Sequence, residues 1–408
     1  MKNVKRILLI VGIVLAMFGS YIFGVNSVSD LYDYPASQDS SSDGDIAKLM
    51  DKKTEKTLNE IVNTIQENYY KDITDDELNE GILRGVVESL DDPYSVYMNQ
   101  EEYKKFMESS DGEYVGVGLV VSPGKDGYIT VVSPVKGSPA EKAGIKTDDK
   151  ILKVNGQEYS ADKMSDAVSV MRGKEGEKVT LTIGRNEKNG FVEKDYDIIR
   201  KKIKLETVFG EMMDDKIGYI GITEFDKPTY TDFVAQYKQL KKDGMKSLIL
   251  DLRGNPGGLL DVCADLADFF LDEGTIVYTK YKDGEKDYYY SDAQKEDIPM
   301  VVLVNGGSAS ASEIVSGALQ DRGRAKIIGT QTFGKGIVQR IFDLNSGQAL
   351  KVTVSEYFTP NDKNIHGIGI EPDIIVELDE DVEGIGTDYL DEDLQLQKAI
   401  EVLKKGNK

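Results

Sequence analysis

The sequence predicts an α/β protein whose largest part is a mainly parallel β-sheet, and two strand–turn–helix stretches carry that prediction. "KSLILDLRGNPGG" (246–258) is an apolar strand that runs into a glycine-rich turn, and the helical pattern "LLDVCADLADFFL" (259–271) follows it. "MVVLVNGG" (300–307) is a second apolar strand, and "SASASEIVSGALQD" (308–321) begins a helix. Repeated strand, turn and helix is typical of a parallel sheet. Because ligands bind beyond the carboxyl ends of such strands, both turns can face one cavity.

Composition excludes several classes of function. The chain has 408 residues, enough for two or three domains, and a formal net charge of −22. That charge argues against nucleic acid as a partner and against an anionic membrane surface as the docking site of the bulk of the chain. The sequence has one cysteine and one histidine, so we expect no intrachain disulfide and no zinc site. We also expect no other metal and no cofactor.

The N-terminus carries a candidate membrane anchor. Basic "MKNVKR" precedes the uncharged run "ILLIVGIVLAMFGSYIFGV" (7–25), which approaches the roughly 20 apolar residues that a membrane helix needs. The basic flank favours a cytoplasmic N-terminus with the remainder exported, that is, a single-pass cell-membrane protein. A cleaved signal peptide is the alternative. We assign 1–26 to the anchor or signal segment and the Ser- and Asp-rich 27–45 to a flexible linker.

Helical patterns follow in residues 46–105. Thr74 is expected to cap the second of these helices, with Glu77 three residues later completing a capping box. These helices can pair with a second copy of the chain or cover the next domain, and the pattern alone leaves both open.

A β-rich segment occupies residues 114–183. Short strands, two short helices and the turns "PGKDG" and "NGQ" occur in an order that resembles a PDZ domain. In that family the backbone amides of a glycine-containing loop hold a peptide's terminal carboxylate, and the peptide adds as a strand. The resemblance places that loop on "VGVGL", which comprises Val115, Gly116, Val117, Gly118 and Leu119. Gly-x-Gly alone would indicate only a strand with small residues.

The second glycine-rich turn holds three candidate nucleophiles, Ser308, Ser310 and Ser312. A serine at a helix N-terminus lies beside unpaired amides that suit an oxyanion, but each of the three can equally be a helix cap, and spacing does not select among them. Lys335, between two glycines, can act as a base only if burial keeps it neutral. The alternative is an exposed turn lysine. The single histidine, His366, lies in a glycine-rich turn and is expected to be a surface residue.

Four motifs in order resemble the carboxyl-terminal processing peptidases, also called tail-specific proteases: "DLRGNPGG" (251–258), "GSASASEI" (307–314), "TFGKGIVQ" (332–339) and "GIGIEPD" (367–373). The likeness extends from about Thr57 to the final helix. It implies Ser310 as nucleophile, Lys335 as base and Gln339 as the residue that orients the lysine. It also implies an oxyanion hole made by the N–H of Ala311 and that of Gly257 or Gly258, a regulatory role for Arg172 at the PDZ junction, and a homodimer formed by the helical arms.

From the residues themselves, we expect several other side chains to be structural. Asp251 and Arg253 should shape the turn by ion pairing, Cys263 should lie in the core, and Glu313 should favour the helix dipole.

The expected fold class is therefore α/β, a largely parallel-sheet serine protease core with an inserted PDZ domain and helical N- and C-terminal arms. The expected segments after the linker are a helical region and possible dimerisation arm at 46–105, the PDZ domain at 106–188, the protease core at 189–380 and a C-terminal helix at 381–408. The expected function is a membrane-anchored, extracytoplasmic serine endopeptidase that cleaves exported proteins and is gated by PDZ recognition of apolar C-terminal tails. The alternatives are a non-catalytic PDZ scaffold and a hydrolase of small esters.

Overall fold

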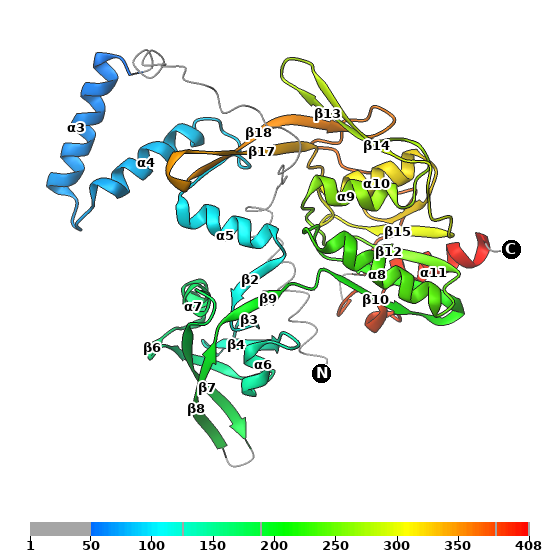
Figure 1. Cartoon of the computed structure of the whole chain (residues 1–408), viewed down its shortest axis with the longest axis horizontal. Coiled ribbons are helices and arrows are strands. Elements are labelled where there is room, and N and C mark those ends of the chain that lie inside the picture. Colours follow the sequence, from blue (N-terminus) through cyan, green and yellow to red (C-terminus); the bar gives the residue numbers. More distant parts are fainter. Residues whose placement is uncertain (1–49, 125, 188–189, 380–381, 407–408) are drawn as a thin grey trace. The chain divides into compact units, whose positions relative to one another are not determined.

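The computed structural model describes residues 50–124, 126–187, 190–379 and 382–406, shown in Figure 1. They form two compact units. Unit 1 contains the described residues within 104–338 and 354–406, and unit 2 contains those within 50–103 and 339–353. The expected anchor at 1–26 and linker at 27–45 lie outside the described residues. Within the described ranges, no helix is both long and apolar enough to span a bilayer.

The largest sheet of unit 1 is mainly parallel, as the sequence predicts. In spatial order its strands are β10 (Val208–Met212), β11 (Ile217–Ile222), β12 (Ser247–Asp251), β15 (Met300–Val304), β16 (Lys326–Gly329) and β19 (Ile374–Ile375). Only the β10–β11 pair is antiparallel. Every residue of β11, β12 and β15 is buried, which is typical of a parallel sheet covered on both faces.

Four helices belong to this sheet: α8 (Thr229–Lys242), α9 (Leu260–Asp268), α10 (Ala311–Asp321) and α11 (Leu394–Gly406). Leu396 and Leu403 of α11 share a buried apolar cluster with residues of β11, β12, β15 and β16, so α11 covers one face of the sheet (Figure 1). Gly218 of β11 faces the other way, because a Cβ there would meet Leu240 of α8. Cys263 on α9 is fully buried, which confirms its expected place in the core.

A smaller antiparallel arrangement completes this part of unit 1. β13 (Gly274–Tyr281) pairs with β14 (Lys286–Ser291) and with the last residues of β18 (Ala349–Phe358). The Tyr357 hydroxyl on β18 donates a hydrogen bond to the Ser310 carbonyl at 3.0 Å. This strand therefore reaches the N-terminus of α10.

The PDZ-like part of unit 1 has its own core. Its elements are β2 (Glu113–Gly116), β3 (Leu119–Pro123), β4 (Ile129–Pro134), α6 (Pro139–Ala143), β5 (Lys150–Val154), β6 (Gln157–Glu158), α7 (Met164–Met171), β7 (Lys178–Glu187), β8 (Gly190–Ile199) and β9 (Lys201–Lys204). The strand order is β3–β4–β5–β7–β8, so β3 lies at an edge of the sheet. Gly144 ends α6 in a left-handed conformation, as expected for a glycine after a helix.

Unit 2 contains α3 (Lys52–Asn68), α4 (Asp75–Glu88) and β1 (Val96–Met98), and both α5 (Gln100–Ser110) and β17 (Ile337–Asp343) lie partly within it. The predicted capping box of Thr74 and Glu77 at the start of α4 is confirmed. Neither α3 nor α4 has a buried residue. Apolar side chains such as Val86, 66% exposed, therefore face outward on these helices.

Candidate active site

The three serines at the start of α10 differ in what their hydroxyls do. Ser308 Oγ donates to the Leu252 carbonyl at 2.8 Å, and Ser312 Oγ donates to the Asn255 carbonyl at 3.0 Å. Both serines are fully buried, whereas Ser310 between them is partly exposed. The structure thus gives two of the three serines an anchoring role and presents Ser310 to an incoming molecule.

The backbone of Ser310 is in an uncommon conformation for a residue other than glycine, with φ 52° and ψ −111°. Such backbone strain persists only where surrounding contacts enforce it, and it concentrates at functional sites. Here the Ser310 N–H donates to Glu313 Oε2 at 2.8 Å, and its carbonyl accepts from Glu313 N–H at 2.9 Å and Ile314 N–H at 3.0 Å. The peptide groups on both sides of the side chain are therefore fixed.

The glycine turn after β12 packs directly against Ser310. A Cβ on Gly257 would lie 2.8 Å from Ser310 Cβ and 3.1 Å from Ala311 N, so only glycine permits this approach. The Gly257 N–H donates to Asn255 Oδ1 at 2.9 Å. Within the described residues, neither the Gly258 N–H nor the Ala311 N–H has a hydrogen-bond acceptor. Of the two glycines that the sequence left open, Gly258 is thus the one with an unpaired N–H.

Glu313 joins the serine segment to the lysine segment, which the sequence did not reveal. Its carboxylate is fully buried and accepts from Ser310 N–H at 2.8 Å, Thr332 Oγ1 at 2.6 Å, Gly334 N–H at 2.7 Å and Lys335 N–H at 2.9 Å. Burial raises the pKa of Glu313, and these hydrogen bonds act in the opposite direction. The role of Glu313 is larger than the expected interaction with the helix dipole, because its carboxylate positions the main chain of both Ser310 and Lys335.

Lys335 is 3% exposed, so the alternative of an exposed turn lysine is wrong. The flanking glycines allow its loop to pack tightly: a Cβ on Gly336 would lie 2.5 Å from His366 N, and one on Gly334 would lie 3.0 Å from Ile368 N. His366 itself is exposed, as expected. Burial of an amine favours its neutral form, which is the form that can accept a proton.

Gln339 and Arg172 are the two other residues to which the family resemblance gives a role. Gln339 is on β17 in unit 2, is 3% exposed, and donates to Thr353 Oγ1 at 3.3 Å. Arg172 directly follows α7 of the PDZ-like part, and its guanidinium lies 4.9 Å from the centroid of the Tyr114 ring.

The five residues of the expected carboxylate loop fall into three structural settings. Val115 and Gly116 belong to β2 and pair with Lys202 and Lys201 of β9. Val117 and Gly118 form the connection to β3, and in the described part of the chain their N–H groups have no acceptor. Leu119 is the first residue of β3.

No group of three or more His, Cys, Asp or Glu side chains that could hold a metal ion occurs among the residues that the structure describes. The groups that the described residues bring together are the Ser310 hydroxyl, the N–H groups of Gly258 and Ala311, and, through the shared Glu313 carboxylate, the main chain of the buried Lys335. These are the parts of an acyl-transfer site.

Three family models and a curated relative agree with this class. The model of peptidase family S41 matches residues 216–376, the PDZ domain model matches 130–185, and the model of the activating protease CtpB N-terminal domain matches 13–102. The carboxy-terminal processing protease CtpA of Bacillus subtilis (strain 168) is 40% identical over 374 residues, which cover 91% of this chain and 76% of that protein. A solved structure, the photosystem II D1 C-terminal processing protease, is 28% identical with a TM-score of 0.48, over 81% of this chain and 91% of that chain.

The fold and the matched sequence define a serine-type peptidase that carries a PDZ domain. The chain belongs to peptidase family S41, the carboxy-terminal processing proteases.

Proposed function

We propose that Ser310 is the nucleophile and Lys335 the general base of an endopeptidase. Neutral Lys335 removes the hydroxyl proton as Ser310 Oγ attacks a peptide carbonyl, which gives a tetrahedral oxyanion. Protonated Lys335 then passes its proton to the leaving amine, and water hydrolyses the acyl-enzyme. We keep Gln339 as the residue that orients Lys335, on the resemblance of "TFGKGIVQ" to the family motif alone.

The N–H groups of Ala311 and Gly258 are proposed to stabilise the oxyanion. Both lack an acceptor in the described residues, and Ala311 begins α10, whose N-terminal dipole favours negative charge. Gly257 contributes differently, since its N–H already donates to Asn255 and its lack of a side chain permits close packing against Ser310.

The observation that carries this proposal is the contrast among the three serines. Ser310 alone is partly exposed, and it has a strained backbone held next to the glycine turn, while the hydroxyls of Ser308 and Ser312 are committed to carbonyl groups. Ser310 is also the N-cap of α10, with Glu313 completing a capping box, but an ordinary N-cap residue has a β-region conformation and not a positive φ.

The first experiment compares Ser310→Ala with Ser312→Ala. Ser310→Ala should abolish cleavage of an unstructured protein such as casein, because no other hydroxyl replaces the nucleophile. Ser312→Ala should keep cleavage and lose about 1–2 kcal/mol of stability with its buried hydrogen bond. Full activity of a folded Ser310→Ala enzyme would contradict the proposal. A wild-type protein that binds tails but cuts nothing would favour the scaffold, and one that prefers small esters to casein would favour the ester hydrolase.

The PDZ-like part is proposed to bind apolar C-terminal tails of substrates and thereby gate cleavage. The edge position of β3 supports addition of a peptide strand, and the unpaired N–H groups of Val117 and Gly118 suit a terminal carboxylate. Leu119 of β3 and Val168 of α7 are partly buried apolar side chains that can contact an apolar tail. Arg172 is proposed to couple tail binding to activity.

We further propose that the chain is a homodimer, anchored in the cell membrane by residues 1–26, with its catalytic part outside the cytoplasm. The outward apolar side chains of α3 and α4 support pairing with a second copy. The basic flank before the apolar run supports the orientation. Light scattering of the protein tests whether it is a homodimer. The mass of its mature N-terminus tests whether residues 1–26 remain attached as an anchor.

A further inference from the structure

We propose that the start of the C-terminal helix is a positioning element for the oxyanion turn, acting through the ion pairs of Arg253 with Asp393 and Asp251. This inference rests on the proposed role of the Gly258 and Ala311 N–H groups. It gives the C-terminal segment a part in catalysis without contact with the substrate.

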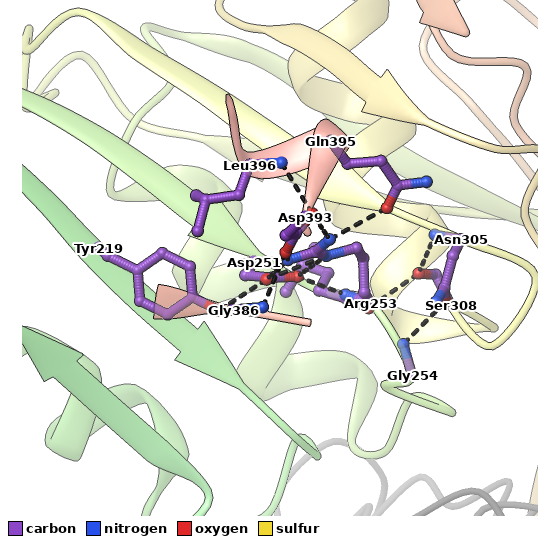
Figure 2. A network of polar contacts seen from close by, with 11 residues as sticks. Tyr219, Asp251, Arg253, Gly254, Asn305, Ser308, Gly386, Asp393, Gln395 and Leu396 are labelled. Carbon is purple, nitrogen blue, oxygen red and sulfur yellow. Dashed lines mark hydrogen bonds and ion pairs between the residues drawn. The ribbon is translucent and has the colours of Figure 1, made fainter. Parts of the chain in front are cut away.

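Arg253 is the centre of a buried polar network (Figure 2). Its Nη1 donates to Asp393 Oδ1 at 2.8 Å and to Gln395 Oε1 at 3.0 Å, and its Nη2 donates to Asp393 Oδ2 at 2.8 Å and to Asp251 Oδ2 at 2.6 Å. Its Nε lies 3.0 Å from both oxygens of Asp251. The side chains of Arg253 and Asp393 are completely inaccessible to solvent. A planar guanidinium that bridges two carboxylates in this way fixes orientation as well as charge.

On the C-terminal side, Asp393 is held by the chain that leads into α11. Its Oδ1 accepts from Leu396 N–H at 2.9 Å, which caps the helix, and its Oδ2 accepts from Gly386 N–H at 2.7 Å. Gln395 Nε2 donates to the Val376 carbonyl at 2.8 Å. Since α11 is packed into the sheet through Leu396, these contacts give Arg253 a fixed partner rather than a mobile one.

On the catalytic side, Arg253 is the first residue of the turn that carries the glycines. Its own N–H donates to Asp251 Oδ1 at 2.9 Å, and the next N–H, that of Gly254, donates to Asn305 Oδ1 at 2.9 Å. Asn255 fixes the next part of the turn. Its carbonyl accepts hydrogen bonds from Ala309 N–H at 3.0 Å and from Ser312 Oγ, and its Oδ1 accepts one from Gly257 N–H. The turn is therefore fixed at its start by Arg253 and at its end by contacts to the nucleophile segment.

A structural role alone does not account for this choice of residues. A buried ion-pair network is often no more stabilising than an apolar cluster of the same size, but it specifies one geometry. An oxyanion donor requires that specificity, because it must meet a charge that exists only in the transition state. The buried ion-pair network is therefore suited to holding the glycine turn, and with it the Gly258 N–H, in one fixed position.

The test measures kcat, KM, melting temperature and the labelling rate by a fluorophosphonate serine probe in the full-length enzyme. Arg253→Lys, which replaces the fork by a single ammonium, should lower kcat and the labelling rate roughly 10-fold to 100-fold, less than outright loss of an oxyanion donor. KM should change little. Asp393→Asn and the milder Gln395→Leu should show the same pattern with smaller losses.

Two variants of the same helix serve as matched controls. Lys404→Met removes the exposed ion pair of α11 with Asp215, 2.6 Å in the structure, and should change nothing. Leu403→Ala removes core packing and should lower the melting temperature while kcat stays at the wild-type value. If Leu403→Ala lowers kcat as much as Asp393→Asn at an equal loss of melting temperature, the network is structural only and the inference is overturned.

Failure of the inference is separable from failure of the proposed function. Wild-type kcat in folded Arg253→Lys and Gln395→Leu, with Ser310→Ala inactive, refutes the positioning role and leaves the nucleophile assignment intact. Activity retained by Ser310→Ala refutes the proposed function itself. Should Arg253→Lys fail to fold, Gln395→Leu decides, because it removes one acceptor and leaves both ion pairs in place.

Discussion

In the part of the chain that the structure describes, the turns that contain Gly258 and Gly118 both have backbone N–H groups without an acceptor, and these two turns are built in different ways. The turn at 257–258, which we propose as part of the catalytic site and call the catalytic turn, lies beside Ser310. The turn at 117–118, which we call the PDZ turn, begins the edge strand β3 of the PDZ-like part. Both suit an anion. In the first the anion would be a transient oxyanion, and in the second a stable carboxylate.

The catalytic turn is held mainly by buried side chains, and the PDZ turn mainly by backbone. Asn255, Ser312 and Arg253 all bind main-chain or carboxylate groups around the catalytic turn. Around the PDZ turn, the carbonyl of Val117 accepts from Ala140 N–H at 2.9 Å, and that of Gly118 accepts from Val135 N–H at 3.0 Å and Ser138 Oγ at 3.1 Å.

This difference agrees with the proposed tasks of the two turns. A stable ligand can adjust its own position within a site, whereas a transition state must find its donors already in place.

The largest effect is expected from Gly258→Ala. Gly258 has φ +142°, and a Cβ there would lie 2.3 Å from the Phe225 carbonyl oxygen, so the turn must shift. Loss of one oxyanion donor should lower kcat on the order of 100-fold to 1,000-fold. Binding of a tail peptide, measured by fluorescence anisotropy, should remain at the wild-type level.

Gly284→Ala is the matched control for this experiment. Gly284 has φ +92° with open space where the Cβ would be, so the substitution strains the backbone without a clash. It should lower stability slightly and leave kcat intact. Equal losses of kcat in Gly258→Ala and Gly284→Ala would show that catalysis does not depend specifically on the conformation of the catalytic turn.

A smaller and different effect is expected from Gly118→Ala. Gly118 has φ +77°, and a Cβ there would lie 2.3 Å from Ser138 Cβ. The affinity for a peptide with a free apolar C-terminus should fall about 10-fold or more, the cost of disturbing roughly one charge-assisted hydrogen bond. Labelling of Ser310 by the serine probe in the absence of a tail should not change.

Gly137→Ala provides the comparison for backbone strain alone. Gly137 has φ +75°, and apart from Gly137 and its two chain neighbours no described residue has an atom within 4 Å of the place that a Cβ would take. Peptide affinity should be normal in this variant. If Gly118→Ala slows probe labelling as strongly as Gly258→Ala does, the two turns are not functionally distinct.

The smallest effect concerns two acids next to the catalytic turn, the half-buried Glu224 and the buried Asp226. Burial and the neighbouring Asp226 carboxylate raise the pKa of Glu224 to about 8, and burial raises the pKa of Asp226 to about 7. Phe225 between them is bonded to the turn, with its N–H donating to the Gly257 carbonyl at 2.9 Å and its carbonyl accepting from Leu259 N–H at 2.7 Å. We therefore expect the stability of the chain around this turn to depend on pH.

The sign follows from proton linkage. Both pKa values are higher in the folded state than in the unfolded state, so the stabilising contribution is complete below the ordinary carboxyl pKa and is lost as pH rises through about 7 to 8. Glu224→Gln should therefore melt at a higher temperature than wild type at pH 8.5 and at a similar temperature at pH 5. The exposed Glu211→Gln should match wild type at both pH values.

Much of the fold was predictable because it follows from local patterns. Apolar runs bounded by glycine turns predicted the parallel sheet, and Cys263 fell on the apolar stripe of its helix. Asp251 and Arg253, two residues apart, were expected to pair, and the structure confirms that they do. In each case the interacting residues are close in sequence or follow from a simple periodicity.

The details of the site depend on contacts that no local pattern encodes. Spacing alone did not distinguish Ser308 and Ser312 from Ser310, and only the family resemblance selected Ser310. In the structure, the hydroxyls of the other two bind carbonyl groups of the segment that follows β12. Glu313 looked like an ordinary first-turn acid, because its partner Lys335 lies on a separate loop. Asp393 gave no signal at all, since its partner Arg253 precedes it by 140 residues.

The short edge strand β3 of the PDZ-like sheet limits the number of residues of a substrate tail that can pair with it. β3 ends at Pro123, which has no N–H to offer a neighbouring strand, and its pairing with β4 is irregular between Val120 and Val121. A tail bound as we propose can pair only along Leu119–Ser122. Unrelated proteins that share the same last few residues would then all be cleaved, and a change of one terminal residue would be enough to prevent cleavage of a protein.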